Sequence, residues 1–223
     1  MRIVRYIIGI DEVGRGALAG PVAVAAVCIP KGVRIANRAF GKLRDSKKLT
    51  AKKREAWAGF LKDHPRVRSA VARVYPRRIE RMNIAEAANL AALRAFKKLT
   101  TNYQLLTTRC AVFLDGGLYL GSRVSPSTSS QPTQGYGGQA GRMAVKTIVR
   151  GDEKIATIKL ASIIAKVSRD RLMTRLAKKH PRYGFDVHKG YGTKAHFAAL
   201  RKHGPSKAHR LTFVGKGAKV ARS

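Results

Sequence analysis

Short apolar segments that suit buried strands recur along the chain. Residues 3–10 and 21–29 are rich in β-branched residues and predict two strands, joined by the glycine-containing segment EVGRGALAG. Residues 67–75 alternate between apolar and polar side chains, as a third strand does. CAVFLD, which ends at Asp115, and AVKTIV, which precedes Gly151, predict two more short strands.

Longer segments between these strands have the apolar spacing of amphipathic helices. One follows Thr50, a suitable N-cap, and stops before Pro65, and an Ala/Leu-rich one starts at Ile84. IKLASIIAKVSRDRLMTRLAKKH is the longest, and its basic residues gather toward the C-terminus, where they suit the helix dipole. KAHFAALRKHG predicts a last short helix that ends at Gly204. This order of elements predicts an α/β fold, with a mixed β-sheet flanked by helices and a helical C-terminal part.

The length of the chain suits a single domain over residues 1–223. The segment at 119–142 is rich in Ser, Gly, Gln and Pro and cannot build a core. We therefore interpret it as a flexible surface loop rather than a domain boundary. Residues 214–223 are basic and predict a loose C-terminal tail.

The chain has neither an apolar run of about 18 residues nor the pattern of a secretory signal. We therefore expect a cytoplasmic protein that has no membrane partner. Cys28 and Cys110 both lie in apolar segments, which favours buried thiols over a disulfide.

Charge narrows the class of partner. The chain has 46 Lys and Arg against 12 Asp and Glu, a net charge of +34. Such self-repulsion is tolerated most easily beside a polyanion, and nucleic acid fits better than an anionic membrane surface. A non-catalytic basic RNA-binding protein has the same composition, so charge alone does not separate binding from catalysis.

The few carboxylates stand in a recurring position. Asp11 ends the first predicted strand with Glu12 beside it, Asp115 ends another strand, and Asp152 follows a third, each close to a Gly. Strand ends of one sheet converge, so these acids can meet, although a single Asp after a strand is more often a turn former. Clustered carboxylates repel one another unless cations neutralise them, and oxygen ligands select Mg²⁺ or Mn²⁺ rather than zinc. An acidic metal cluster on a basic surface is what two-metal cleavage of a phosphodiester requires.

Motifs along nearly the whole chain resemble bacterial ribonuclease HII. They are DEVGRG at 11–16, DSKKLT at 45–50, LDG at 114–116, GD at 151–152, LASIIAKVSRDRLM at 160–173, YGFDVHKGYGT at 183–193 and HGPSKAHRLTF at 203–213. The resemblance implies a ribonuclease H-like fold and Mg²⁺- or Mn²⁺-dependent endonucleolytic hydrolysis of RNA in RNA–DNA hybrids. It also implies incision of duplex DNA 5′ to an embedded ribonucleotide, leaving 3′-hydroxyl and 5′-phosphate ends.

The resemblance also assigns roles to individual residues. The four metal-binding, catalytic acids of the family match Asp11, Glu12, Asp115 and Asp152. The Gly-Arg-Gly that reads the ribose 2′-hydroxyl matches Gly14, Arg15 and Gly16, and the tyrosine at the RNA–DNA junction matches Tyr191. This chain departs from the family at Ala17, where Pro is usual, and in the length of the segment between Asp115 and Asp152.

Other polar residues have two readings each. Ser46, Lys47 and Lys48 suit contacts to a substrate phosphate, or form a solvated basic turn. Asp170 is either a fifth acid near the metals or the partner of a neighbouring Arg, which we favour.

Aromatic residues of the C-terminal part divide in the same way. The histidines are expected to be structural rather than general acids: His188, His196, His203 and His209. Tyr183 is expected to fill a core pocket, whereas Tyr191, flanked by glycines, is expected to be more exposed.

Rival hypotheses differ in what they require. A non-catalytic RNA-binding protein needs no clustered acids and no divalent cation. Another two-metal nuclease or integrase of the same fold would lack the Gly-Arg-Gly and Tyr191 pair. The favoured partners are therefore RNA–DNA hybrids and ribonucleotide-containing duplex DNA, bound by a monomer.

Overall fold

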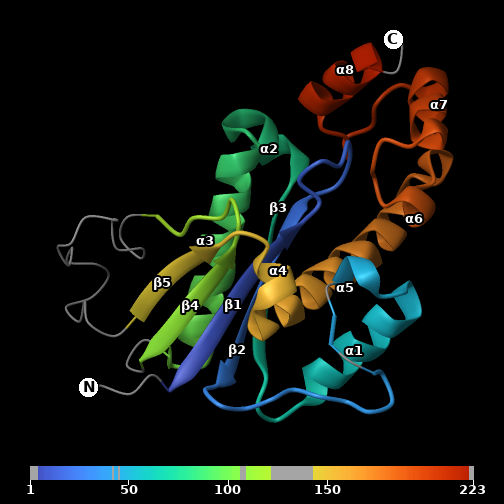
Figure 1. The fold of residues 1–223 in the computed structure, drawn as a ribbon. Coiled ribbons are helices and arrows are strands. Elements are labelled where there is room, and N and C mark those ends of the chain that lie inside the picture. The colour runs from blue at the N-terminus through green and yellow to red at the C-terminus, as the bar shows by residue number, and fades with distance from the viewer. Residues whose placement is uncertain (1–4, 42, 45, 106–108, 122–142, 221–223) are drawn as a thin grey trace.

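The structure is a computed structural model that describes residues 5–41, 43–44, 46–105, 109–121 and 143–220 (Figure 1). Its five-stranded sheet has the order β3-β2-β1-β4-β5. The strands are β1 (Tyr6–Val13), β2 (Val22–Pro30), β3 (Arg68–Val74), β4 (Cys110–Asp115) and β5 (Met143–Ile148). β1, β2 and β3 pair antiparallel, and β4 joins β1 and β5 in parallel. The predicted mixed sheet is therefore confirmed.

The first strand runs further than its composition predicts. Asp11, Glu12 and Val13 continue the antiparallel ladder of β1 with β2, so the acids lie inside the strand rather than after it. The expectation that Asp11 ends the strand was wrong, because backbone pairing with the buried β2 continues through Glu12 to Val13. Side chains alternate along a strand, so Asp11 and Glu12 leave β1 on opposite faces, although their carboxylate oxygens come together with that of Asp115 near the end of the strand.

Helices cover both faces of the sheet. The helical elements are η1 (Ser46–Lys48), α1 (Ala51–Asp63), α2 (Pro76–Met82), α3 (Ile84–Asn102), α4 (Gly151–Lys154), α5 (Ala156–Lys179), η3 (Pro181–Tyr183), α6 (Phe185–His188), α7 (Lys194–His203) and α8 (Leu211–Val220). Thr50 caps α1 as predicted, since its hydroxyl accepts the N–H of Lys53. Pattern analysis missed α2, which starts at Pro76 and is too short for a helical period to stand out.

Two apolar cores form on the two faces of the sheet. α3 packs on the face that carries Ile8 and Ile10, whereas α1 and α5 pack on the face that carries Ala25 and Val27 (Figure 1). A Cβ on Gly9 would lie 2.3 Å from the backbone of Thr157, so glycine lets α5 rest directly on β1. This contact sets α5 against the same face of β1 as Asp11.

Both cysteines lie in the sheet interior. Cys28 and Cys110 are buried and form no disulfide, as predicted. Burial raises the pKa of Cys28 to about 12 and that of Cys110 to about 11, so neither is a thiolate at neutral pH.

A third core joins the C-terminal part to the turn after β1. It includes Leu18, Met173 and Phe185. Phe213 packs against this core, and the backbone N–H and hydroxyl of Thr212 donate to the carboxylate of Glu80 on α2. These contacts start α8, so the expectation of a loose tail from residue 214, after a last helix at 204, was wrong as far as Val220.

Some expectations fall outside the described residues. The predicted loop at 119–142 lies there from residue 122 onward, and the tail does so from residue 221. Among the described helices, none is both long and apolar enough to cross a membrane.

Candidate active site

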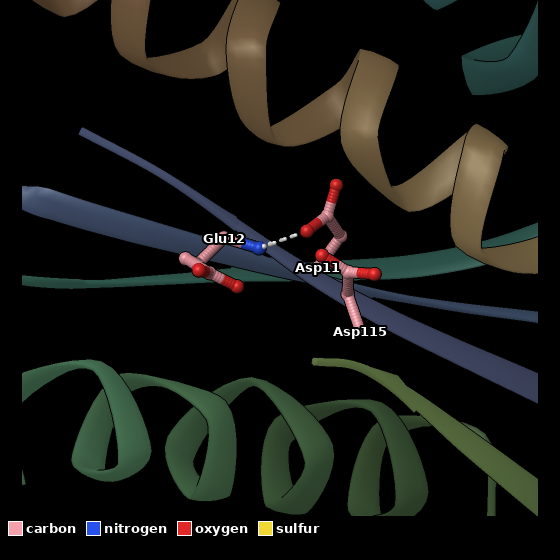
Figure 2. Close-up of side chains that lie close together, drawn as sticks. All are labelled: Asp11, Glu12 and Asp115. Carbon is pink, nitrogen blue, oxygen red and sulfur yellow. Dashed lines mark hydrogen bonds between the residues drawn. The ribbon is translucent and has the colours of Figure 1, made fainter. Parts of the chain in front are cut away.

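Carboxylates from two neighbouring inner strands, β1 and β4, meet near the C-terminal ends of these strands. β1 and β4 run parallel with Ile10 opposite Leu114, so the next residues, Asp11 and Asp115, stand side by side. Carboxylate oxygens of Asp11, Glu12 and Asp115 all lie within 4.8 Å of one another (Figure 2). The backbone N–H of Glu12 donates to Asp11 Oδ1 at 2.7 Å. The sequence therefore predicted this part of the cluster correctly.

Among the described residues, one ion pair, from Arg15 to Glu12, balances only part of the negative charge of the cluster. Asp11 is only 4% exposed, and burial together with the charge of Glu12 raises its pKa well above the usual value. Burial also raises the pKa of Glu12, against the opposing effect of Arg15, whose guanidinium lies 3.3 Å from Glu12 Oε1. The other oxygen, Glu12 Oε2, is buried and has no hydrogen-bond partner among the described residues.

Asp152 takes a different position from the other acids. It lies buried in α4, and its Oδ2 accepts from Lys47 Nζ at 3.1 Å. Its backbone N–H and that of Gly151 both point to Asp115 Oδ1, at 3.4 and 2.6 Å. The structure thus brings Asp152 beside Asp115 through the backbone, while the Asp152 carboxylate pairs with Lys47.

The three-acid cluster fits a divalent cation. All its donors are carboxylate oxygens, which suit Mg²⁺ or Mn²⁺ better than zinc. A cation there would partner the orphaned Glu12 Oε2 and would relieve the repulsion that raises the pKa values of Asp11 and Glu12.

A cavity of about 440 Å³ opens beside the acids. Asp11, Glu12 and Asp115 line it. The other predicted site residues that line it are Gly14, Arg15, Gly16, Ser46, Lys47 and Tyr191. Residues from four separate stretches of the chain therefore meet where the sequence analysis expected a substrate site, and Asp152 stands at its border through Lys47.

Hydrogen bonds from the buried Arg210 fix the Gly-Arg-Gly turn. The guanidinium of Arg210 donates to the carbonyls of Gly14 and Arg15, each at 2.7 Å, and to that of Gly20 at 3.0 Å. Gly14 has a φ of +87°, and a Cβ there would lie 2.2 Å from Arg169. Because C=O and N–H point in opposite directions across a trans peptide, the N–H groups of Arg15 and Gly16 point away from Arg210.

Two basic side chains of α5 contact the ring of Tyr191. The Arg169 guanidinium lies 5.3 Å from the centroid of its ring, and Lys166 Nζ lies 6.0 Å from it. The Tyr191 carbonyl accepts from His196 Nδ1 at 2.9 Å. As expected, Tyr191 is more exposed than Tyr183, which is buried and donates its hydroxyl to the Gly204 carbonyl.

The remaining polar residues are mostly engaged within the protein. Ser46 is buried and its hydroxyl bonds that of Ser162 at 2.7 Å, whereas Lys47 and Lys48 are exposed. Asp170 pairs with Lys166 at 2.9 Å, so the expected ion pair exists, but with a Lys instead of an Arg.

The histidines form a buried network in the C-terminal part. His196 Nε2 lies 3.0 Å from His209 Nε2, and His209 Nδ1 accepts the N–H of Ser206 at 2.9 Å. Burial lowers the pKa of both histidines to about 4, so they are neutral at pH 7. His188 Nε2 lies 2.6 Å from the Tyr183 carbonyl. These bonds support the structural reading of His188, His196 and His209.

Sequence reasoning missed two buried arginines that hold the turn after β1, beside the cavity. Arg169 and Arg210 are both 0% exposed, and together they donate to carbonyls on either side of Leu18. Both stand in motifs quoted for the resemblance, but an Arg is usually exposed, so neither position indicates burial. The buried guanidiniums organise the turn through backbone contacts, which sequence patterns do not record.

The mixed sheet and its cluster of carboxylates beside a basic cavity define a nuclease of the ribonuclease H class. The chain belongs to the ribonuclease HII family, whose model, described as Ribonuclease HII, matches residues 8–216. Ribonuclease HII of Chlamydia caviae is 40% identical over 208 residues, which cover 93% of this chain and 84% of that protein.

Solved structures confirm the expected ribonuclease H-like fold. Ribonuclease H2 from Pyrococcus horikoshii OT3 has a TM-score of 0.69 at 23% identity, covering 98% of this chain and 99% of that one. Bst-RNase HIII in complex with Mn²⁺ has a TM-score of 0.67 at 22% identity, covering 98% of this chain and 70% of that one.

Proposed function

We propose that this protein cleaves the RNA strand of RNA–DNA hybrids and nicks duplex DNA 5′ to an embedded ribonucleotide. The products are a 3′-hydroxyl and a 5′-phosphate, and the protein works as a cytoplasmic monomer. The observation that carries this proposal is that the acid cluster, the Gly-Arg-Gly turn and Tyr191 line one cavity. An RNA-coating protein has no use for three carboxylates so close together on a strongly basic chain.

Catalysis in this proposal requires Mg²⁺ or Mn²⁺ held by Asp11, Glu12, Asp115 and Asp152. When bound, such ions supply an activated water and stabilise charge on the attacking and leaving oxygens. Asp11, Glu12 and Asp115 stand ready as ligands, since their oxygens already converge. Asp152 joins them when its carboxylate leaves Lys47, whose side chain is 80% exposed and holds it only weakly.

Recognition of the ribose is assigned to the backbone of the Gly-Arg-Gly turn. The 2′-hydroxyl is the one group that separates ribose from deoxyribose, and it both donates and accepts hydrogen bonds. The N–H groups of Arg15 and Gly16 point away from Arg210, and both residues line the cavity, so they are available as donors to that hydroxyl. Gly14 has no side chain to force Arg169 away from the turn.

Tyr191 and the basic residues position the rest of the substrate. The Tyr191 ring, braced by Arg169, packs on the sugar next to the ribonucleotide. Lys47 is exposed at the cavity and suits a backbone phosphate. Ser46 contributes by fixing the start of η1, since its hydroxyl is already bonded to Ser162.

Mapping the nick tests this proposal. The substrate is a labelled DNA duplex with one ribonucleotide, incubated with Mg²⁺, with Mn²⁺ or with EDTA, and the control is the same duplex made of DNA alone. We expect one metal-dependent cut on the 5′ side of the ribonucleotide and none in the control. Cutting elsewhere, or cutting in EDTA, would contradict the proposal. Asp11→Asn provides the matched inactive protein and excludes a contaminating nuclease.

A further inference from the structure

A second cavity lies outside the candidate active site. It has a volume of about 650 Å³ and opens at the end of β3, between α2 and α3. Apart from Val74 and Met82, its lining is entirely cationic or aromatic. We call the set the arginine hollow: Arg73, Tyr75, Arg77, Arg78, Arg81 and Arg94.

The positive charge of the arginine hollow is not neutralised within the described residues. Arg77, Arg78, Arg81 and Arg94 are exposed, and the ion pairs of the described part of the chain involve other cations. The acid of α2, Glu80, instead accepts from Thr212 on α8. Exposed arginines gathered around a concave surface suit the phosphates of a polyanion.

Two further residues of the arginine hollow suit nucleic acid in particular. Tyr75 is 53% exposed, although large aromatic side chains are usually buried, and an exposed ring beside guanidiniums can stack on a base or sugar. Arg73 is anchored through its guanidinium, which donates to Ser168 on α5, and its Nε is buried with no hydrogen-bond partner among the described residues. An acidic protein segment would use the charges but would not need the ring.

The arginine hollow and the acid cluster lie at the same end of the strands of the sheet. Val74 pairs with Val22, and Val13 pairs with Ala23, so the end of β3 lies beside the end of β1. Neighbouring strands lie about 4.8 Å apart, which places these two ends about 10 Å from each other. One turn of duplex spans about 34 Å, so a duplex at the acids has phosphates near the arginine hollow.

The helix α5 connects the two sites. Its Ser162 bonds Ser46 at the active-site cavity, and its Ser168 accepts from Arg73 at the arginine hollow. Six residues of helix correspond to a rise of about 9 Å. The two sites therefore rest on one rigid support at a spacing shorter than a turn of duplex.

We propose that the arginine hollow is a second phosphate-binding surface, which grips the duplex to one side of the cleavage site. This inference rests on the proposed function for the identity of the substrate. It adds that the arginine hollow binds the phosphates of the duplex beside the cleavage site, whatever the base sequence there. Its contribution is to affinity and to the salt dependence of binding, since each phosphate contact releases counterions.

Binding without metal tests the proposal independently of cleavage. The variant is Arg77→Gln/Arg78→Gln/Arg81→Gln. The control, Lys31→Gln/Lys62→Gln/Arg66→Gln, removes the same charge from exposed residues near the opposite end of β2 and β3. In EDTA, affinity for a 30-base-pair duplex is measured at several salt concentrations.

We expect the hollow variant to lose at least about tenfold in affinity at low salt, with a log–log salt slope flatter by about 0.9 for each contact removed. The control should lose much less. Unchanged binding by the hollow variant, or an equal loss in the control, overturns the proposal. With unchanged binding, an acidic protein segment would be the better candidate partner of the arginine hollow.

Nicking of asymmetric duplexes tests the position of the contact. Two duplexes carry the ribonucleotide near one end or near the other, so that only one has a flank over the arginine hollow. The hollow variant should lose kcat/KM on that substrate and keep it on the other, and an equal loss on both overturns the one-sided contact. If the wild-type protein cuts neither duplex at the ribonucleotide, the proposed function fails, while the binding experiment still decides whether the arginine hollow holds nucleic acid.

Discussion

Replacing Asp11 with Asn should stabilise the metal-free protein while it abolishes cleavage. The carboxylate oxygens of Asp11, Glu12 and Asp115 lie within 4.8 Å, and two unit charges at that distance repel by about 3.5 kcal/mol at an effective dielectric constant of about 20. Asp11→Asn removes two such pairs, and its amide oxygen can still accept the N–H of Glu12. Partial protonation of the cluster reduces the gain, so we expect about 2–4 kcal/mol.

The difference in stability between Asp11→Asn and the wild-type protein should depend on pH in a definite direction. Burial and repulsion raise the pKa of Asp11 in the folded protein above the value of about 3.9 for an unfolded chain. The folded state therefore binds more protons than the unfolded state above about pH 4, and the wild-type protein loses stability as pH rises through that range. Asp11→Asn lacks this loss, so its stability advantage over the wild-type protein should appear above about pH 4. The advantage should be largest above the raised pKa of Asp11 in the folded protein.

Thermal or urea unfolding in EDTA at pH 5 and pH 8 measures the effect. A gain of 2–4 kcal/mol corresponds to roughly 5–15 °C in Tm for a chain of this size. Mn²⁺ should then stabilise the wild-type protein and not the variant, because only ligands that bind the folded state raise its stability. Asp63→Asn, an exposed position on α1, is the control and should change stability by less than about 0.5 kcal/mol. A metal-free Asp11→Asn protein no more stable than wild type at pH 8 would refute the reasoning.

Three further outcomes are expected. His196 and His209 have folded pKa values of about 4, below the unfolded value of about 6.5. Urea unfolding should therefore show the free energy of unfolding falling as pH is lowered from 6.5 to 4, by up to about 1.4 kcal/mol per pH unit for each histidine. A His209→Gln protein whose stability changes with pH as steeply as that of wild type would contradict this. Arg210→Met removes the donor to three carbonyls and should lower the free energy of unfolding by roughly 2–4 kcal/mol, measured by thermal unfolding. The variant should also lose more in kcat/KM for a single-ribonucleotide duplex than in affinity for DNA. Equal losses would show that Arg210 has no positioning role. Tyr191→Ala should impair nicking at single ribonucleotides more than cleavage of long hybrids, with Tyr191→Phe milder, and a uniform loss on both substrates would mean that the ring only braces its loop.

The sequence was most informative where apolar periodicity and strand pairing agree. All the predicted strands are present, and the meeting of Asp11 with Asp115 follows from the parallel register of β1 and β4. The position of Asp152 was harder to foresee, because it depends on how α4 turns back after β5 and on the exposed Lys47. Periodicity also says little about a seven-residue helix such as α2.

The buried arginines mark the physical limit of sequence reading. A guanidinium is normally exposed, and only the three-dimensional placement of carbonyls makes burial of Arg169 and Arg210 favourable. For the same reason, the arginine hollow is not visible in the sequence, where its residues are a small part of a chain that is basic throughout.

The bond between Arg210 and the Gly14 carbonyl joins residues that are 196 positions apart in the chain. Contacts of such long range carry the largest loop-closure entropy and tend to form late in folding. During synthesis, the strands that carry Asp11 and Asp115 can pair well before residue 210 leaves the ribosome. The growing chain therefore acquires its acids first and the support of its Gly-Arg-Gly turn last, so the arrangement that we propose for ribose recognition is complete only once residue 210 has emerged.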